Sequence, residues 1–166
     1  MLHNINQGLE VHLDQVLQLN ENAVPHVNSL KMRELRKIVG ESKCFLVALD
    51  ESDNVAAFLI TMDDTADYQS PNYQYFLKNF RSFLYVDRIV VRDDCHGQGL
   101  GRKLYESVTE QVSENPFDYL TCEVNIRPPN PDSMAFHSRC GFAGVDEQDT
   151  EGGQKRVLLM AKNLKG

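Results

Sequence analysis

The most informative group of residues in this sequence is a glycine-rich loop, which reads His96-Gly97-Gln98-Gly99-Leu100-Gly101-Arg102. It follows an apolar run that is typical of a strand and precedes apolar residues at helical spacing. Glycines at alternate positions let the backbone approach a ligand closely. The first amides of a helix have no partner within the helix, and the helix dipole favours an anion there. The loop therefore predicts a binding site for a diphosphate.

Three other interpretations of this loop have to be compared with that one. A dinucleotide-binding fingerprint has the spacing GxGxxG after the first strand of a domain, whereas this loop has GxGxG and follows a late strand. A Walker loop requires GxxxxGK[ST], and this loop has no such lysine and hydroxyl pair. A turn that merely begins a helix remains open, because short glycine motifs are weakly specific.

A second motif follows downstream, in the run from Asn130 to Phe142, which reads NPDSMAFHSRCGF. Together the two motifs resemble the GNAT acetyltransferase superfamily, in which a strand ending in valine leads into Arg/Gln-x-x-Gly-x-Gly/Ala at the start of a helix. His96 stands where that family usually has Arg or Gln, and His137 where it usually has Tyr. The resemblance is strongest over residues 83–142, and segments akin to DYQSPNY and EVNIRPPNP extend it to a bacterial subgroup of acetyltransferases.

The resemblance implies a mixed α/β fold in a single domain over residues 1–166. Its central sheet is mostly antiparallel and flanked by helices, with one parallel pair of strands, at 83–91 and 119–124, that splays apart. The implied acyl donor is acetyl-CoA, with its diphosphate on the loop and its pantetheine arm along the first of these strands. The implied cofactor-binding residues are Ile89, Val91, His96, Gly97, Gln98, Gly99, Gly101, Arg102 and Asn130.

Two carboxylates stand inside otherwise apolar strands, Asp87 and Glu123. Acetyl transfer to an amine needs a base, and burial in general raises the pKa of a carboxyl group, which makes it a better base near neutral pH. Each of the two is therefore a candidate catalytic base. The alternative for both is a structural ion pair, for instance with Arg88 or Arg127.

His137 occupies the position at which the family's tyrosine protonates the departing CoA thiolate, so the resemblance implies a catalytic acid there. The alternative is a helix histidine that hydrogen-bonds the backbone and packs against Phe142. The histidines at positions 3, 12 and 26 belong to no such group of residues, and we expect them at the surface.

The long connection at residues 62–81 is the best clue to the acceptor, because long connections in compact domains are usually functional. It combines tyrosines with Asp63, Asp64 and Asp67, a composition that suits a cationic amine. We predict that Tyr68, Tyr73 and Tyr75 form the wall of the acceptor site. The alternative is attachment of the segment to the core, which we expect for Phe76, Leu77 and Phe80.

Composition limits the other classes of function. Acidic residues outnumber basic ones by 24 to 17, which argues against a nucleic-acid partner. No apolar run approaches the roughly 20 residues of a membrane helix, and the first residues lack the features of a secretory signal, so we expect a cytoplasmic protein without a membrane partner. The four cysteines are far apart, which predicts reduced, mostly buried thiols and no metal site. Members of the family often form homodimers, but no patch in this sequence identifies an interface.

The elements that must position these residues can be predicted from periodicity and turn signals. We expect helices near 8–20 and near 30–39, the second stopped by Gly40, and a short helix capped by Ser70. A further helix follows the glycine loop, and another ends before Gly141. The expected strands are 44–49, 55–60, 83–91, 119–124, 142–148 and 155–162, the last two joined by a turn at Gly152–Gly153.

The predicted function is that of an N-acetyltransferase that transfers an acetyl group from acetyl-CoA to a primary amine of a small molecule or peptide. The alternative is a GNAT module that holds CoA or acyl-CoA as a sensor without turnover. Asp87, Glu123 and His137 favour catalysis, because a sensor needs none of them.

Overall fold

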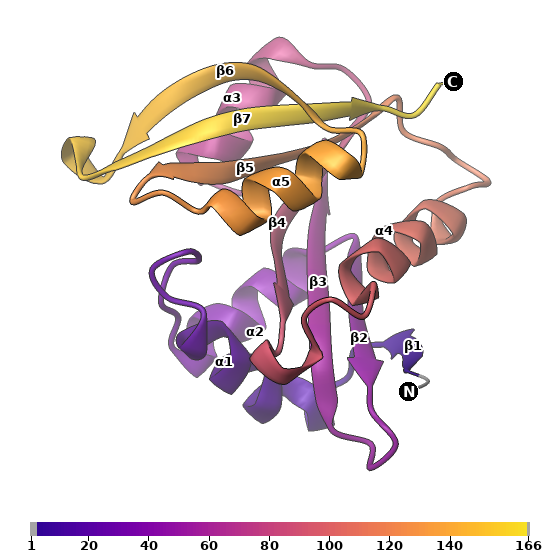
Figure 1. Cartoon of the computed structure of the whole chain (residues 1–166). Helices are drawn as coiled ribbons and strands as arrows, with labels where there is room; N and C mark the ends of the chain where they lie inside the picture. Colours follow the sequence, from indigo (N-terminus) through magenta and orange to yellow (C-terminus); the bar gives the residue numbers. More distant parts are fainter. Residues whose placement is uncertain (1–2, 166) are drawn as a thin grey trace. The chain divides into compact units, whose positions relative to one another are not determined.

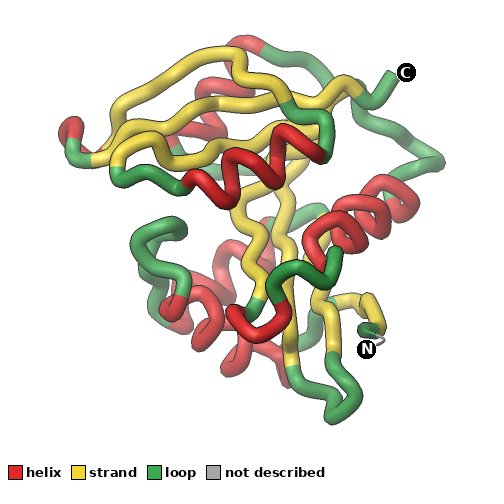
Figure 2. Tube along the Cα trace, viewed as in Figure 1, coloured by secondary structure: helices red, strands yellow, loops and turns green. Residues whose placement is uncertain are grey.

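The computed structural model describes residues 3–165, in which seven strands form one sheet with the order β1-β2-β3-β4-β5-β7-β6 (Figures 1 and 2). The strands are β1 (Asn4–Gln7), β2 (Cys44–Leu49), β3 (Val55–Asp63), β4 (Phe83–Val91), β5 (Tyr119–Arg127), β6 (Ala143–Thr150) and β7 (Lys155–Asn163). The α-helices are α1 (Leu13–Asn22), α2 (Met32–Glu41), α3 (Pro71–Asn79), α4 (Leu100–Gln111) and α5 (Pro131–Arg139).

The sheet is mostly antiparallel. Strand β2 pairs antiparallel with β1 and β3, and β7 pairs antiparallel with β5 and β6. The exception is the parallel pair β4–β5, whose register runs from Phe83 opposite Tyr119 to Tyr85 opposite Thr121. These findings confirm the predicted mixed α/β fold with one parallel pair, whereas the splaying of that pair stays a prediction.

The contacts divide the chain into two units that alternate along the sequence. The first unit comprises the chain up to Met62 together with Asp87–Pro116, and the second comprises Asp63–Val86 together with the chain from Phe117 onward. The first residues of β4 therefore belong to the second unit and its last residues to the first. The single domain predicted over residues 1–166 stays a prediction.

In the first unit, α1 and α2 pack through their apolar faces. Helix α1 buries Leu13, Val16 and Leu19, and α2 buries Leu35 and Ile38. Both helices were predicted, although α1 is preceded by a 3-10 turn at Glu10–His12.

Two expectations for the first unit are wrong. Gly40 does not stop α2 but lies inside it, and the helix ends where Ser42 adopts an extended conformation with φ −70° and ψ 148°. His3 is not at the surface, because only 8% of it is exposed. The short strand β1 was not predicted, since three of its four residues are polar and it is recognised only through its pairing with β2.

In the second unit, α3 buries Tyr73 and Phe76, as the predicted spacing requires. Ser70 stands at the predicted N-cap position, but its side chain makes no capping hydrogen bond. Leu77 was expected to attach the segment to the core, and this expectation is wrong, because Leu77 is 42% exposed. Gly141 has the predicted left-handed conformation after α5, with φ 95°.

The four cysteines are reduced, buried thiols, as predicted. Within residues 3–165, no helix combines the length and the hydropathy that a membrane span requires.

Candidate functional site

The predicted diphosphate loop lies in the first unit, between β4 and α4. Gly97 and Gly99 have φ values of +79° and +77°, a region that only glycine adopts readily. A Cβ atom added at either position would meet no atom within 4 Å. Glycine is therefore required here by the backbone conformation, and the space above the loop is open to a ligand.

The backbone amides at the start of α4 suit an anion. The first hydrogen bond of the helix runs from the Lys103 amide to the Gly99 carbonyl oxygen over 3.0 Å. The amides of Leu100, Gly101 and Arg102 precede this donor, so they belong to the helix turn that offers its N–H groups outward. The structure thus fits the group that the loop is predicted to hold, although the individual cofactor contacts stay predictions.

The junction of β4 and the loop is fixed by side chains. His96 is mostly exposed, and its Nε2 atom lies 2.9 Å from the carbonyl oxygen of Val91. Arg92 pairs with Asp94 at 2.6 Å and with Asp50 at 3.1 Å, and these carboxylates raise its pKa. In this conformation His96 ties the loop back to the strand, whatever it contributes to cofactor binding.

The burial of the residues along β4 alternates from Asp87 to Val91. As whole residues Asp87, Ile89 and Val91 are half-buried, whereas Arg88 and Val90 between them are buried. The exposed part of Asp87 is its backbone, because only 4% of its side chain is exposed. The three predicted residues therefore share one face of the strand, as the pleat predicts.

Asp87 takes part in an ion pair, the alternative considered for it above. The Arg88 Nε atom donates to the Asp87 carboxylate over 2.7 Å, and both side chains are buried. The same guanidinium donates to the Asn20 side-chain oxygen over 2.8 Å and to the Asn28 carbonyl oxygen over 3.3 Å. This carboxylate therefore already serves a buried cation, which makes it a weaker candidate for the base.

Glu123, in the second unit, has a different partner. The Tyr85 hydroxyl lies 2.9 Å and 2.8 Å from the two carboxylate oxygens of Glu123. Glu123 is half-buried, so the hydrogen bond from Tyr85 orients its carboxylate while part of the residue stays accessible to solvent. Burial raises the pKa of the neighbouring Cys122 thiol, and the charge of Glu123 adds to that rise. Of the two predicted carboxylates, Glu123 therefore fits the base better.

The register of the sheet assigns Glu123 to the face that carries α3. Glu123 lies opposite Leu159 of β7, and residues that face each other across an antiparallel pair share a face. Tyr119 lies four residues earlier on the same face of β5, and its ring lies 5.0 Å from that of Phe80, directly after α3. The tyrosines of the 62–81 segment therefore lie on the face of Glu123.

His137 lies on the other face of β5. Cys122 points away from the face of Glu123, and the thiol of Cys140, at the end of α5, contributes after burial and Glu123 to its raised pKa. Figure 1 likewise shows α5 and α3 on opposite sides of β5. The structure therefore brings Glu123 together with the tyrosine segment but not with His137.

The environment of His137 matches the alternative considered for it. Its side chain is buried at 3% exposure, and its ring packs edge-on against Phe142 at 5.2 Å. Its Nδ1 atom lies 2.9 Å from the Ser133 carbonyl oxygen, which can only accept, so Nδ1 carries the proton. Burial lowers the pKa of His137, which leaves the ring neutral at neutral pH. A neutral ring in this tautomer is poorly suited to protonate a thiolate through Nε2.

Asn130 caps α5. Its side-chain oxygen accepts a hydrogen bond from the Ser133 amide over 3.3 Å, as is typical of an N-cap residue. Its predicted contact with the cofactor stays a prediction.

The three predicted acceptor-site tyrosines differ in exposure. Tyr73 is fully buried, and its hydroxyl donates to the carbonyl oxygens of Asp63 and Ala66 over 2.7 and 3.2 Å. Tyr68 and Tyr75 are half-buried. Tyr73 therefore has a core position, whereas the other two can offer part of their surface to a ligand.

Tyr68 and Tyr75 have different neighbours. The Tyr68 ring lies 6.4 Å from the ring of Tyr85, which in turn holds Glu123. Burial raises the pKa of Tyr75, and Asp146 of β6 adds to the rise through its charge and a hydrogen bond. Both tyrosines therefore remain candidates for an acceptor wall.

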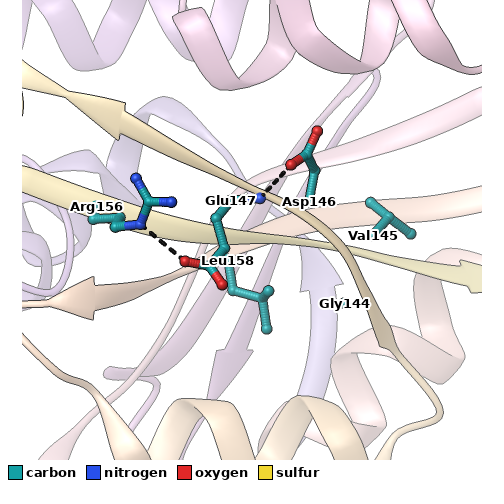
Figure 3. Close-up of a pocket in the computed structure, with 6 residues that line it drawn as sticks. All are labelled: Gly144, Val145, Asp146, Glu147, Arg156 and Leu158. Carbon is teal, nitrogen blue, oxygen red and sulfur yellow. Dashed lines mark hydrogen bonds and ion pairs between the residues drawn. The ribbon is translucent and has the colours of Figure 1, made fainter.

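A pocket lies on β6 and β7. It is lined by Gly144, Val145, Asp146, Glu147, Arg156 and Leu158 (Figure 3). Leu158 lies opposite Val124 of β5, so its side chain projects from the face opposite to that of Glu123, whereas Asp146 lies opposite Leu159 and belongs to the face of Glu123. Glu147 and Arg156 form an ion pair of 2.9 Å in the lining. Glu123 is not among the residues that line this pocket.

No group of three or more His, Cys, Asp or Glu side chains within residues 3–165 is arranged to hold a metal ion.

The Asp87–Arg88 ion pair was the alternative that the sequence offered, whereas Tyr85 was not predicted as a site residue. Tyr85 has the same strand parity as Asp87, but the parallel register that brings it to Glu123 has no local signal in the sequence.

Comparison with known proteins identifies the family of this chain. The sequence profile of the acetyltransferase (GNAT) family matches residues 13–142. A search of curated proteins found no significant match.

Solved structures share the fold. Ribosomal-protein-alanine N-acetyltransferase from Brucella melitensis superposes with a TM-score of 0.73 at 18% identity, covering 97% of this chain and 99% of that one. NAA60 from Arabidopsis thaliana, solved with a bisubstrate analogue, gives a TM-score of 0.79 at 14% identity, with 99% of each chain covered. A chain of the NatC complex bound to Gag peptide and CoA gives 0.78 at 13% identity, covering 99% of this chain and 100% of that one.

Proposed function

Because the chain belongs to the acetyltransferase (GNAT) family, we propose that it transfers the acetyl group of acetyl-CoA to a primary amine. The observation that carries this proposal is the loop before α4. There two glycines with positive φ precede the first helical amides, and the space above Gly97 and Gly99 is open. That arrangement suits the diphosphate of CoA, because helix N-terminal amides favour anions.

The strand before the loop suits the rest of the donor. Asp87, Ile89 and Val91 share a half-buried face of β4, along which an extended pantetheine arm can lie. The loop amides of Gly97, Gly99, Gly101 and Arg102 are assigned to the diphosphate. These amides would attract the diphosphate electrostatically, so a substitution that adds negative charge to the loop opposes binding of acetyl-CoA.

Glu123 is the base that this function needs. Its carboxylate accepts a proton from the ammonium form of the acceptor, and the freed amine nitrogen attacks the thioester carbonyl carbon. A new C–N bond forms and the C–S bond breaks. CoA leaves as a thiolate, which takes up the second proton that the nitrogen loses, and Glu123 returns the first proton to solvent. A thiol with a pKa near 8.5 leaves with little assistance at neutral pH, so the reaction does not require an acid as strictly as a base.

The acceptor is a small or peptide-like primary amine that binds beside the 62–81 segment. Tyr68 and Tyr75 support this assignment, since both are half-buried on the face of Glu123. Aromatic faces attract cations, and Asp146 next to Tyr75 adds a negative charge. Among proteins of the same fold, one is a ribosomal-protein-alanine N-acetyltransferase and another binds a peptide together with CoA, which makes peptide N-termini the first acceptors to try.

A panel of amines tests the function. Purified protein is incubated with acetyl-CoA and amino acids, polyamines, aminoglycosides or peptides, and the release of CoA thiol is followed. We expect amine-dependent release that Glu123→Gln lowers by at least roughly a hundredfold, as loss of a general base does. Binding of acetyl-CoA without release for any amine would instead favour a CoA-binding sensor.

A further inference from the structure

Tyr85 is held rigidly at the centre of an aromatic cluster in the second unit. Its ring is fully buried. The rings of Tyr73, Phe76 and Tyr68 lie 5.6, 6.0 and 6.4 Å from it, in tilted or edge-on arrangements. Side chains packed on several sides in this way keep a single rotamer. The position of the Tyr85 hydroxyl is therefore fixed by packing and does not depend on a ligand.

The Tyr85 hydroxyl donates a hydrogen bond to the carboxylate of Glu123. It lies within 2.9 Å of both oxygens of Glu123, and since it has one proton it serves both as a shared donor. The parallel register explains the meeting, because Tyr85 lies opposite Thr121 and Glu123 is the next residue on the same face of β5. Hydrogen bonds to an ionised group are stronger than those between neutral groups.

We propose that Tyr85 is a positioning residue for the acetyl transfer, which fixes the orientation of the Glu123 carboxylate and stabilises its ionised form. This inference rests on the proposed function, in which Glu123 is the base. Tyr85 acts through Glu123 and not on the substrates. The aromatic cluster thus has a consequence for catalysis, because it holds the donor that keeps the base ready to accept a proton.

Ionisable groups surround this pair in the second unit. On the same face of the sheet, Asp146 of β6 lies beside Tyr75, and on β5 the adjacent ionisable group is the buried thiol of Cys122. The phenol of Tyr73, on α3, donates to backbone carbonyl oxygens. The Tyr85 hydroxyl donates directly to the Glu123 carboxylate, and such a hydrogen bond favours the ionised form.

The test compares Tyr85→Phe with Tyr73→Phe. Both variants remove one hydroxyl from the same buried cluster, but only the first removes a donor to Glu123. For Tyr85→Phe we expect the acid limb of the pH profile of kcat to move to higher pH by about one unit, with kcat on the plateau roughly tenfold lower. The KM for acetyl-CoA stays within twofold. For Tyr73→Phe we expect the acid limb to stay at its wild-type position.

A second measurement separates failure of this inference from failure of the proposed function. The titration midpoint of the Glu123 carboxyl is followed by 13C NMR in the full chain without substrate, and Glu123→Gln identifies its signal. Tyr85→Phe should move this midpoint up by about one pH unit, whether or not an acceptor is known. An unmoved midpoint and an unmoved acid limb would overturn the positioning role. A moved midpoint with full activity in Glu123→Gln would leave the pairing intact and overturn the assignment of Glu123 as the base.

Discussion

Arg88 donates its Nε hydrogen to the carboxylate of Asp87 over 2.7 Å, so two residues adjacent in the sequence form an ion pair with 6% and 4% of their side chains exposed. The same guanidinium reaches back to Asn20, at the end of α1, and to the backbone of Asn28. A carboxylate in this position supports the structure of the first unit.

This pair gives the first prediction. Asp87→Asn removes the carboxylate that pairs with the buried Arg88 guanidinium, so the free energy of unfolding should fall by about 3 kcal/mol, measured by urea denaturation. The matched control is Glu147→Gln, which breaks the more exposed pair with Arg156 and should cost less than about 1 kcal/mol. Equal costs for the two variants would mean that the Asp87 pair contributes no more than an exposed one.

A glutamate in the glycine loop should prevent binding of acetyl-CoA. Gly99→Glu adds a negative charge where the diphosphate is assigned, and it forces a side chain onto a residue with φ +77°. We expect no measurable binding of acetyl-CoA by calorimetry, with a circular dichroism spectrum like that of the wild type. Gly40→Glu adds the same charge to an exposed position of α2 in the same unit and should bind normally. Normal affinity in a folded Gly99→Glu variant would refute the loop assignment.

Acid should destabilise the protein through His137. Burial lowers the pKa of His137 in the folded state below its ordinary value of about 6.5, so the unfolded chain binds the proton more readily. The contribution of His137 to stability is therefore fully present above about pH 6.5 and is lost as the pH falls toward the lower folded-state pKa. Urea denaturation at pH 7.5 and 5.5 checks this.

The variant His137→Phe keeps a ring against Phe142 but cannot titrate. The wild type should lose more stability than this variant between the two pH values, by up to about 1.4 kcal/mol for each pH unit below 6.5. Identical losses would show that His137 does not titrate abnormally. In turnover assays, a rate unchanged by His137→Phe would confirm a structural histidine, and a large loss of kcat would restore the predicted acid.

The tyrosine segment gives a prediction about the acceptor. Tyr68→Ala and Tyr75→Ala remove half-buried rings on the face of Glu123, so the KM for the acceptor should rise by roughly five- to tenfold, in line with about 1 kcal/mol for each cation–π contact. The KM for acetyl-CoA should not change. Leu77→Ala, an exposed position of α3, is the control and should leave both constants unchanged. Wild-type constants in both tyrosine variants would place the acceptor elsewhere.

Much of the fold could be predicted because its signals are local. The strand Phe83–Val91 has its predicted bounds, and Gly141 ends α5 with the left-handed conformation that its residue type favours. Gly40 shows the limit of such signals, because a glycine permits a helix end without requiring one. β1 shows another limit, since a four-residue segment with three polar side chains becomes a strand only through pairing with β2.

The site could be predicted only in part, for a related reason. The glycine loop is a contiguous motif, and its positive φ values follow from its composition. The roles of Asp87 and Glu123 depend instead on their neighbours in space. From the sequence, Asp87 and Glu123 are both candidates for the base, and the burial of the Asp87–Arg88 pair is seen only in the structure. Glu123 meets its partner Tyr85 through a parallel register that no short stretch of sequence encodes.

The alternation of the two units along the chain has a consequence for folding and inheritance. The chain enters the second unit at Asp63, returns to the first at Asp87 and leaves it again after Pro116, so neither unit is a contiguous stretch of gene. Recombination cannot exchange either unit as a single segment, and a nascent chain cannot complete the first unit before the start of the second has been synthesised. Each unit must also close a loop across residues of the other, a long-range step that slows folding relative to locally connected domains.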